Sequence, residues 1–154
     1  MNDSIKSFTV KYDGVANAII TRCGISEPYD PKSQVGKAKP NVSEAKVLWD
    51  TGATASVVTK SVVDALNLFP IGKIEVHHAN GTSIVNTYYV NVYLPNRISY
   101  KFIKVSEGIL GEFDLLIGMD IITTGDFAVT NSSKRTTFSF RCPPIEEIDF
   151  TSHK

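Results

Sequence analysis

Short stretches in which apolar and polar residues alternate run along most of the chain, and turn-forming residues separate them. Threonine, valine, isoleucine and aromatic residues dominate these stretches, as is typical of β-strands. The pattern predicts strands over residues 8–12, 15–22, 46–49, 56–58, 73–78, 83–94, 100–105, 113–117, 127–130 and 136–140. Two brief helices are expected, one capped by Thr59 or Ser61 and one that begins at Asp120 and ends before Gly125. The sequence therefore predicts an all-β fold with one or two short helices.

Turn signals join several of these strands into hairpins. The pair Asp13-Gly14 lies between the first two expected strands and predicts that they pair with each other. The pair Asn80-Gly81 is a second strong hairpin signal. By contrast, residues 23–45 are rich in proline and lysine and show no alternation, so they predict a long loop. This loop is either a mobile connection or a functional segment.

The composition supports one domain and gives no support to nucleic-acid or membrane binding. With 154 residues, 42% of them hydrophobic, the chain is long enough for a single domain with a real core. Its 16 basic and 16 acidic residues cancel, whereas proteins that bind nucleic acid usually have a basic excess. No apolar run approaches the roughly 20 residues of a membrane span, and the first residues, MNDSIKSF, lack the apolar stretch of a secretory signal. We therefore expect a cytoplasmic protein without nucleic-acid or membrane partners.

The sequence has no spacing typical of a metal site, so we expect neither a metal nor a cofactor. Cys23 and Cys142 form neither a zinc-type spacing nor a disulfide framework. His77 and His78 are adjacent on an expected strand, so their side chains point to opposite faces and cannot hold one ion.

A carboxylate at the end of an apolar strand is the most informative feature of the sequence. Residues 46–49 (KVLW) lead directly into Asp50, Thr51, Gly52 and Ala53. Burying an acid is costly, so an acid in this position indicates a functional role. The glycine allows a tight turn and a close approach by another group.

The motif D-T-G-A at residues 50–53 resembles the catalytic loop of the retropepsin-like aspartic proteases. Two further elements occur in that family's order and spacing. One segment begins 29 residues after Asp50 and resembles the family's flap hairpin. It consists of Ala79, Asn80, Gly81 and Thr82. The other segment begins 66 residues after Asp50 and consists of Leu116, Ile117 and Gly118. It resembles the family's hydrophobic-hydrophobic-glycine element, which packs behind the catalytic loop.

This resemblance implies a closed acid-protease β-barrel that forms a homodimer. It assigns residues 8–141 to one protease domain, with residues 23–45 as a long loop insertion. Residues 1–7 are then an N-terminal extension, and residues 142–154 are a C-terminal tail.

The resemblance also implies the chemistry. Aspartic proteases need two facing carboxylates that share one proton. This chain has a single D-T-G, so a symmetric homodimer must supply Asp50 twice. Thr51 would then hydrogen-bond across the two-fold axis, Gly52 would contact the substrate backbone, and the flap would close over an extended peptide. The expected activity is that of a homodimeric aspartic endopeptidase that uses no metal.

Two other functions are compatible with the same sequence. One is a catalytically silent dimerisation or peptide-binding module of the same fold. The other is an unrelated β-barrel binding protein in which the D-T-G is accidental. The intact motif argues against the silent module, because a binding module has no need of a buried acid. Asp120, the other acid near a glycine, is expected to be a helix cap rather than a catalyst.

Two departures from the family affect the packing and the dimer. Trp49 is bulkier than the aliphatic residue that usually precedes the catalytic aspartate, so the packing around it should be adjusted. The pair Pro143-Pro144 ends regular pairing and argues against interleaved C-terminal strands. The dimer is instead expected to use residues 136–140 or the N-terminal strand.

Overall fold

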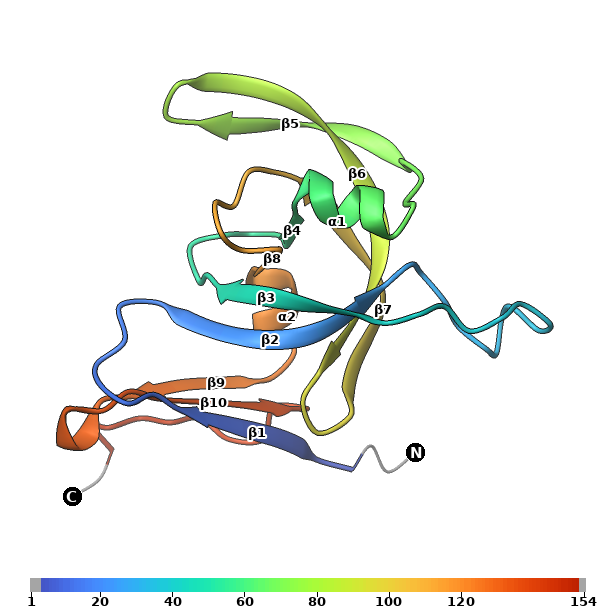
Figure 1. Ribbon diagram of the computed structural model, residues 1–154. Coiled ribbons are helices and arrows are strands. Elements are labelled where there is room, and N and C mark those ends of the chain that lie inside the picture. The colour runs from blue at the N-terminus through green and yellow to red at the C-terminus, as the bar shows by residue number, and fades with distance from the viewer. Residues whose placement is uncertain (1–3, 153–154) are drawn as a thin grey trace.

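The computed structural model describes residues 4–152, and this range contains ten strands, two α-helices and one 3₁₀ turn (Figure 1). In chain order the elements are β1 (Lys6–Lys11), β2 (Ile19–Ser26), β3 (Ser43–Trp49), β4 (Val57–Val58), α1 (Lys60–Ala65), β5 (Gly72–His78), β6 (Gly81–Leu94), β7 (Ile98–Glu107), β8 (Leu115–Ile117), α2 (Met119–Ile122), β9 (Asp126–Thr130), η1 (Ser132–Lys134) and β10 (Thr137–Cys142). Every strand overlaps a stretch that the alternating pattern predicts. The all-β prediction is therefore confirmed.

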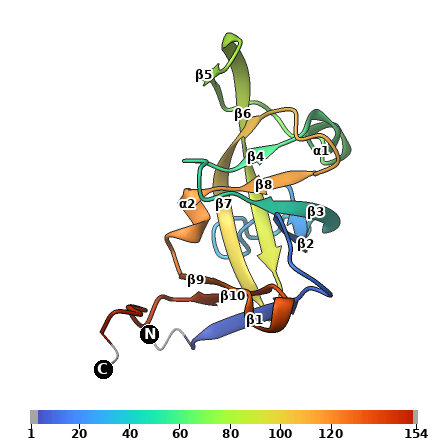
Figure 2. The same cartoon turned by 90° about the vertical axis from the view of Figure 1, so that its left-hand side faces the viewer.

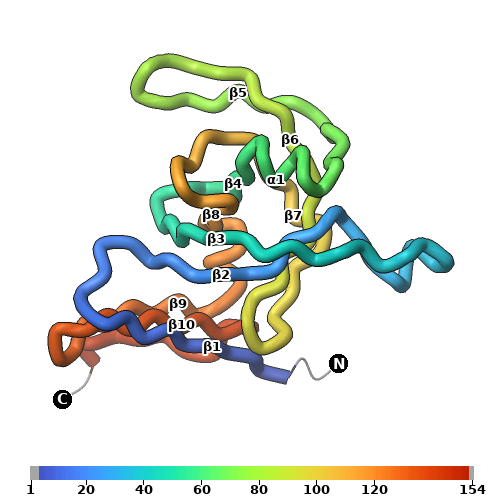
Figure 3. The backbone as a smooth tube through the Cα atoms, viewed as in Figure 1, coloured from blue at the N-terminus to red at the C-terminus, as the bar shows by residue number. Residues whose placement is uncertain are grey.

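Six of the strands close into a barrel. Neighbours pair in the order β2, β3, β8, β4, β7 and β6, and β6 returns to pair with β2, where Tyr93 lies opposite Gly24. The β3–β8 and β4–β7 pairs are parallel, whereas the other neighbours in the barrel are antiparallel. The first part of β6 leaves the barrel and pairs with β5 as a projecting hairpin, which Figure 3 shows above the barrel. Closure pairs both edges of the sheet and removes exposed strand edges from the barrel.

A separate three-stranded sheet lies beside one end of the barrel, below it in Figures 1 and 2. Its order is β1, β10, β9, with antiparallel pairing throughout. Because β10 is the central strand, both of its edges are occupied within the chain. Residues 137–140 therefore offer no free strand edge for pairing with a second chain.

The hairpin that Asp13 and Gly14 predict between the first two strands is also absent. β1 pairs with β10, whereas β2 pairs with β3 and β6. The pairing on the β10 side continues past the end of β1: the Tyr12 N–H donates to the Thr136 carbonyl at 3.0 Å, and the Thr136 N–H donates to the Gly14 carbonyl at 3.0 Å. The turn residues therefore extend the β1–β10 pairing instead of reversing the chain into β2.

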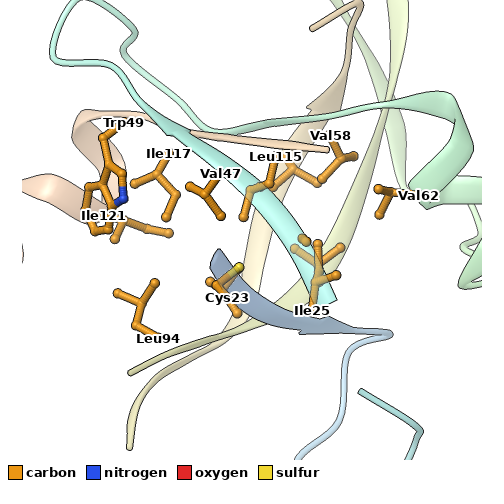
Figure 4. Packing of buried hydrophobic residues seen from close by; sticks show 14 of the residues in the cluster. Cys23, Ile25, Val47, Trp49, Val58, Val62, Leu94, Leu115, Ile117 and Ile121 are labelled. Atoms are coloured by element: carbon orange, nitrogen blue, oxygen red, sulfur yellow. The ribbon is translucent and has the colours of Figure 1, made fainter. Parts of the chain in front are cut away.

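Trp49 connects the barrel to the three-stranded sheet. Its ring centroid lies 5.0 Å from that of Phe138 and 5.3 Å from that of Phe140, both on β10. Its indole N–H donates to Thr21 Oγ1 on β2 at 2.9 Å, so the one polar atom of the ring is satisfied. Figure 4 shows Trp49 beside Ile117 of β8 in the buried cluster. The bulky side chain is accommodated by aromatic residues of the second sheet, and it fixes the backbone at the end of β3.

The long proline-rich loop spans residues 27–42, because β2 and β3 each extend further into it than the alternation predicts. Two contacts tie this loop to the outside of the barrel. Asn91 Nδ2 on β6 donates to the Tyr29 carbonyl at 2.6 Å, and Lys101 Nζ on β7 donates to Asp30 Oδ1 at 2.8 Å. The loop therefore packs against β6 and β7.

Candidate active site

Asp50 follows directly after β3, where β3 runs parallel to β8. Its N–H donates to the Ile117 carbonyl at 3.0 Å, which continues the β3–β8 pairing by one residue. Trp49 is buried, whereas Asp50 itself is half-buried. The acid is thus held at the rim of the barrel by a backbone that the core fixes.

The loop after β3 folds back onto the Asp50 carboxylate. Asp50 Oδ1 accepts a hydrogen bond from the Gly52 N–H at 2.8 Å, and the Asp50 carbonyl accepts one from the Ala53 N–H at 3.2 Å. A Cβ at position 52 would lie 3.1 Å from Oδ1, so the glycine leaves room for the carboxylate. Thr51 and Gly52 are exposed. Within residues 4–152 the Gly52 contact is the one hydrogen bond of this carboxylate, which leaves Oδ2 free to take another group.

Leu116, Ile117 and Gly118 lie directly behind this loop. The first two are buried in β8, and Gly118 is the N-cap of α2. The next residue, Met119, donates its N–H to the Ala53 carbonyl at 2.8 Å. A Cβ on Gly118 would lie 2.8 Å from that same carbonyl oxygen, closer than real Cβ atoms approach. The loop can therefore lie this close to α2 only because position 118 is glycine.

Two polar residues that sequence reasoning did not place in the site hold the same loop. Ser56, which is fully buried, donates from Oγ to Asp120 Oδ1 at 2.8 Å and from its N–H to Asp120 Oδ2 at 3.0 Å. Asp120 lies inside α2, whose N-cap is Gly118, so the prediction that Asp120 caps this helix is wrong. The sequence does carry a signal for both residues. Ser56 lies at the edge of an apolar run shortly after Asp50, and Asp120 lies at the edge of another shortly after Gly118.

The projecting β5–β6 hairpin, here called the flap, lies over the side of the barrel that carries the Asp50 loop (Figure 1). Ala79 and Asn80 form its tip and are exposed, as are the residues that follow them. Gly81 has a φ of 126°, in the left-handed region that favours glycine. Thr82 lies opposite His77 in the flap ladder. These four tip residues are therefore brought together, on an element separate from the one that carries Asp50.

The fold as a whole is similar to that of solved structures. No protein-family model and no curated protein matches the sequence. The structure matches the crystal structure of a retropepsin-like aspartic protease from Rickettsia conorii, with a TM-score of 0.52 and 16% identity over 90% of this chain and 96% of that chain. It also matches EIAV protease complexed with the inhibitor HBY-793, with a TM-score of 0.51 and 20% identity over 73% of this chain and 91% of that chain.

The chain has a retropepsin-like fold. The resemblance inferred from the D-T-G-A motif and its two companion elements is therefore confirmed for the fold. The retropepsin-like fold accounts for the closed barrel and for the small helical content. Neither of the two short helices in residues 4–152 has the length and apolar character needed to cross a membrane.

The loop over residues 50–56 carries one carboxylate in each chain, that of Asp50. Both oxygens of Asp120 accept hydrogen bonds from Ser56 behind the loop, so Asp120 does not face Asp50 as a second acid. In the part of the chain that the structure describes, no three or more His, Cys, Asp or Glu side chains gather as a metal-binding group.

Proposed function

We propose that the protein is a homodimeric aspartic endopeptidase, in which the two Asp50 carboxylates, one from each chain, activate the water that hydrolyses a peptide bond. The observation that supports this most directly is the half-buried Asp50 at the end of β3, held by its own Gly52 turn on an exposed loop of a retropepsin-like fold. Taking an acid partly out of water costs free energy, so an acid held in this position indicates a functional role.

The proposed reaction follows from the behaviour of two close carboxylates. Two like charges about 3 Å apart cannot both ionise easily, so the pair holds one proton. The ionised Asp50 takes a proton from the water as its oxygen attacks the carbonyl carbon, and the protonated Asp50 gives its proton to the carbonyl oxygen. The C–N bond of the tetrahedral diol then breaks. The nitrogen takes the proton that the first Asp50 removed from the water, and a diol hydroxyl gives a proton to the second Asp50. The products are a carboxylic acid and an amine, with no covalent enzyme intermediate.

The neighbouring residues have supporting roles in this proposal. Thr51 would hydrogen-bond across the two-fold axis and join the two loops. Gly52 would contact the backbone of an extended peptide. The flap tip would close over that peptide by β-type pairing, a common way to bind an extended chain.

The free edge of β9 is the proposed contact between the two chains. Of the three strands in the second sheet, β1 and β9 each have one unpaired edge. β9 is the next strand after α2, and α2 contacts the Asp50 loop through Met119 and Asp120. Figure 2 shows α2, β9 and the loop before β4 towards one side of the molecule, with β1 further across. Antiparallel pairing of β9 with its copy would join the two three-stranded sheets and bring the Asp50 loops together.

Introducing lysine at Val129, a partly exposed residue of β9, is expected to weaken the dimer at least about tenfold. With the two-fold axis near the middle of β9, antiparallel pairing places the two copies of residue 129 close together, so two lysines would repel. Thr9→Lys, at an exposed position of β1, is the matched control and should leave the dimer unchanged. For both variants, the dissociation of the dimer is measured by light scattering and by the fall of specific activity on dilution. A weaker dimer in Thr9→Lys alone would place the interface at β1.

The chemistry is tested by digesting a peptide library at pH values from about 3 to 8, with and without EDTA. We expect cleavage within the peptides, a bell-shaped pH profile and no effect of the chelator. The bell arises because a second proton on the dyad removes the base, and loss of the shared proton removes the acid. Loss of cleavage with EDTA would contradict a carboxylate mechanism. A wild-type dimer that cleaves no peptide would favour the catalytically silent module.

A further inference from the structure

We infer that Ser56 and Asp120 form a clamp that positions the Asp50 loop for catalysis. The clamp consists of the Ser56 hydroxyl and N–H and the Asp120 carboxylate. The two residues are positioning residues, since they act through the loop and lie behind it, away from the side on which a peptide would bind. The expected effect on kcat rests on the proposed function, whereas the expected ordering of the loop rests on the hydrogen bonds alone.

The clamp is a hydrogen-bond network in which Ser56 is fully buried and Asp120 is half-buried. Ser56 Oγ donates to Asp120 Oδ1 and also accepts from the Gly118 N–H at 3.1 Å. The Ser56 N–H donates to Asp120 Oδ2. Asp120 Oδ1 accepts a further hydrogen bond from the Ile121 N–H at 3.0 Å. One hydroxyl and one carboxylate thus satisfy the N–H groups of three residues at the back of the loop.

The clamp holds the far end of the loop, and β8 holds its near end. At the near end the Asp50 N–H donates to the Ile117 carbonyl. At the far end two backbone hydrogen bonds accompany the clamp, from Met119 to Ala53 and from Asp120 to the Thr54 carbonyl. The residues between these ends are mostly exposed. Their position therefore depends on the two anchors.

Each partner in the clamp has a chemical role that its closest replacement cannot fill. Without the Ser56 hydroxyl, the Gly118 N–H loses its acceptor in a buried place, and an unsatisfied buried donor is costly. A carboxylate accepts at both oxygens, so Asp120 can receive both Ser56 donors. An asparagine at position 120 would direct its NH₂ group at one of them.

The position of the loop determines whether two Asp50 carboxylates can share a proton. They must approach to about 3 Å, and misplacement of a reacting group by about 1 Å can cost a hundredfold in rate. The flap, which would close over the peptide, is separate from the clamp, whereas Gly52 lies in the loop that the clamp holds. Loss of the clamp should therefore lower kcat by a larger factor than it raises KM.

The test compares Ser56→Ala with Ser26→Ala, which removes another fully buried and hydrogen-bonded serine far from the loop. With both variants above the dimer dissociation constant, Ser56→Ala should lose roughly a hundredfold in kcat, and Ser26→Ala should keep the wild-type value. Asp120→Asn should follow Ser56→Ala, whereas Asp30→Asn on the 27–42 loop should not. If Ser56→Ala and Ser26→Ala have equal kcat values, the clamp has no positioning role.

Amide hydrogen exchange gives a second readout that does not depend on activity. The Gly52 amide donates a hydrogen bond to Asp50 within the loop, and the Met119 amide donates one from α2 to the Ala53 carbonyl of the loop. Both amides should therefore exchange faster in Ser56→Ala than in Ser26→Ala. If the wild type cleaves no peptide, the proposed function fails, and amide exchange alone tests whether the clamp holds the loop. Unchanged exchange at both amides in Ser56→Ala would then overturn the clamp, and faster exchange would support it.

Discussion

Replacing Asp50 by asparagine is expected to lower kcat by at least about a thousandfold and to leave the fold and the dimer intact. Asparagine has nearly the same shape as aspartate, but it can neither take a proton from water nor hold the proton that the dyad shares. Its side-chain oxygen can still accept the hydrogen bond from Gly52, so the turn should persist. The substitution also removes the repulsion between two carboxylates, which should not weaken the dimer.

The measurement is kcat on a peptide selected from the library, together with the dissociation constant of the dimer. Asp64→Asn is the matched control, because Asp64 is an exposed residue of α1 that pairs with Lys60 at 2.9 Å. The control should retain wild-type kcat. If Asp50→Asn turned over the peptide as fast as Asp64→Asn, Asp50 would not be the catalytic residue.

Gly118→Ala is expected to lower kcat by about a hundredfold and to reduce the free energy of unfolding by about 1–3 kcal/mol. The new Cβ would lie 2.8 Å from the Ala53 carbonyl oxygen and from the backbone of Ala55. These are backbone atoms, so the overlap can be relieved only if the Asp50 loop moves away from α2. That movement would break the hydrogen bond between Met119 and Ala53 and displace the carboxylate.

Gly14→Ala provides the control, since a Cβ at Gly14 would have no atom within 4 Å. Urea denaturation and kcat should be measured for both variants. The control should remain within about 0.5 kcal/mol of the wild type, as is usual for open surface positions. Equal stabilities and equal kcat values for the two variants would mean that the loop does not need its close contact with α2.

Much of the candidate site is predictable because its local parts join residues that are close in the chain. An apolar stretch that alternates with polar residues predicts β3, and the acid that ends it is visible as Asp50. The turn between Asp50 and Gly52 forms within three residues. The flap tip similarly follows from the turn preference of Asn80 and Gly81. Each of these features depends on local backbone preferences.

The sequence by itself thus determined the strands, the acid at the end of β3 and the likeness to a retropepsin-like fold. Only the tertiary structure decided which distant segments meet. Asp13 and Gly14 permit a turn, yet β1 pairs with β10, because that pairing buries Phe8 against Phe138 at a ring separation of 5.8 Å. Ser56 and Asp120 meet across 64 positions of the chain. Such contacts depend on which surfaces bury each other, and local alternation carries no information about the partner.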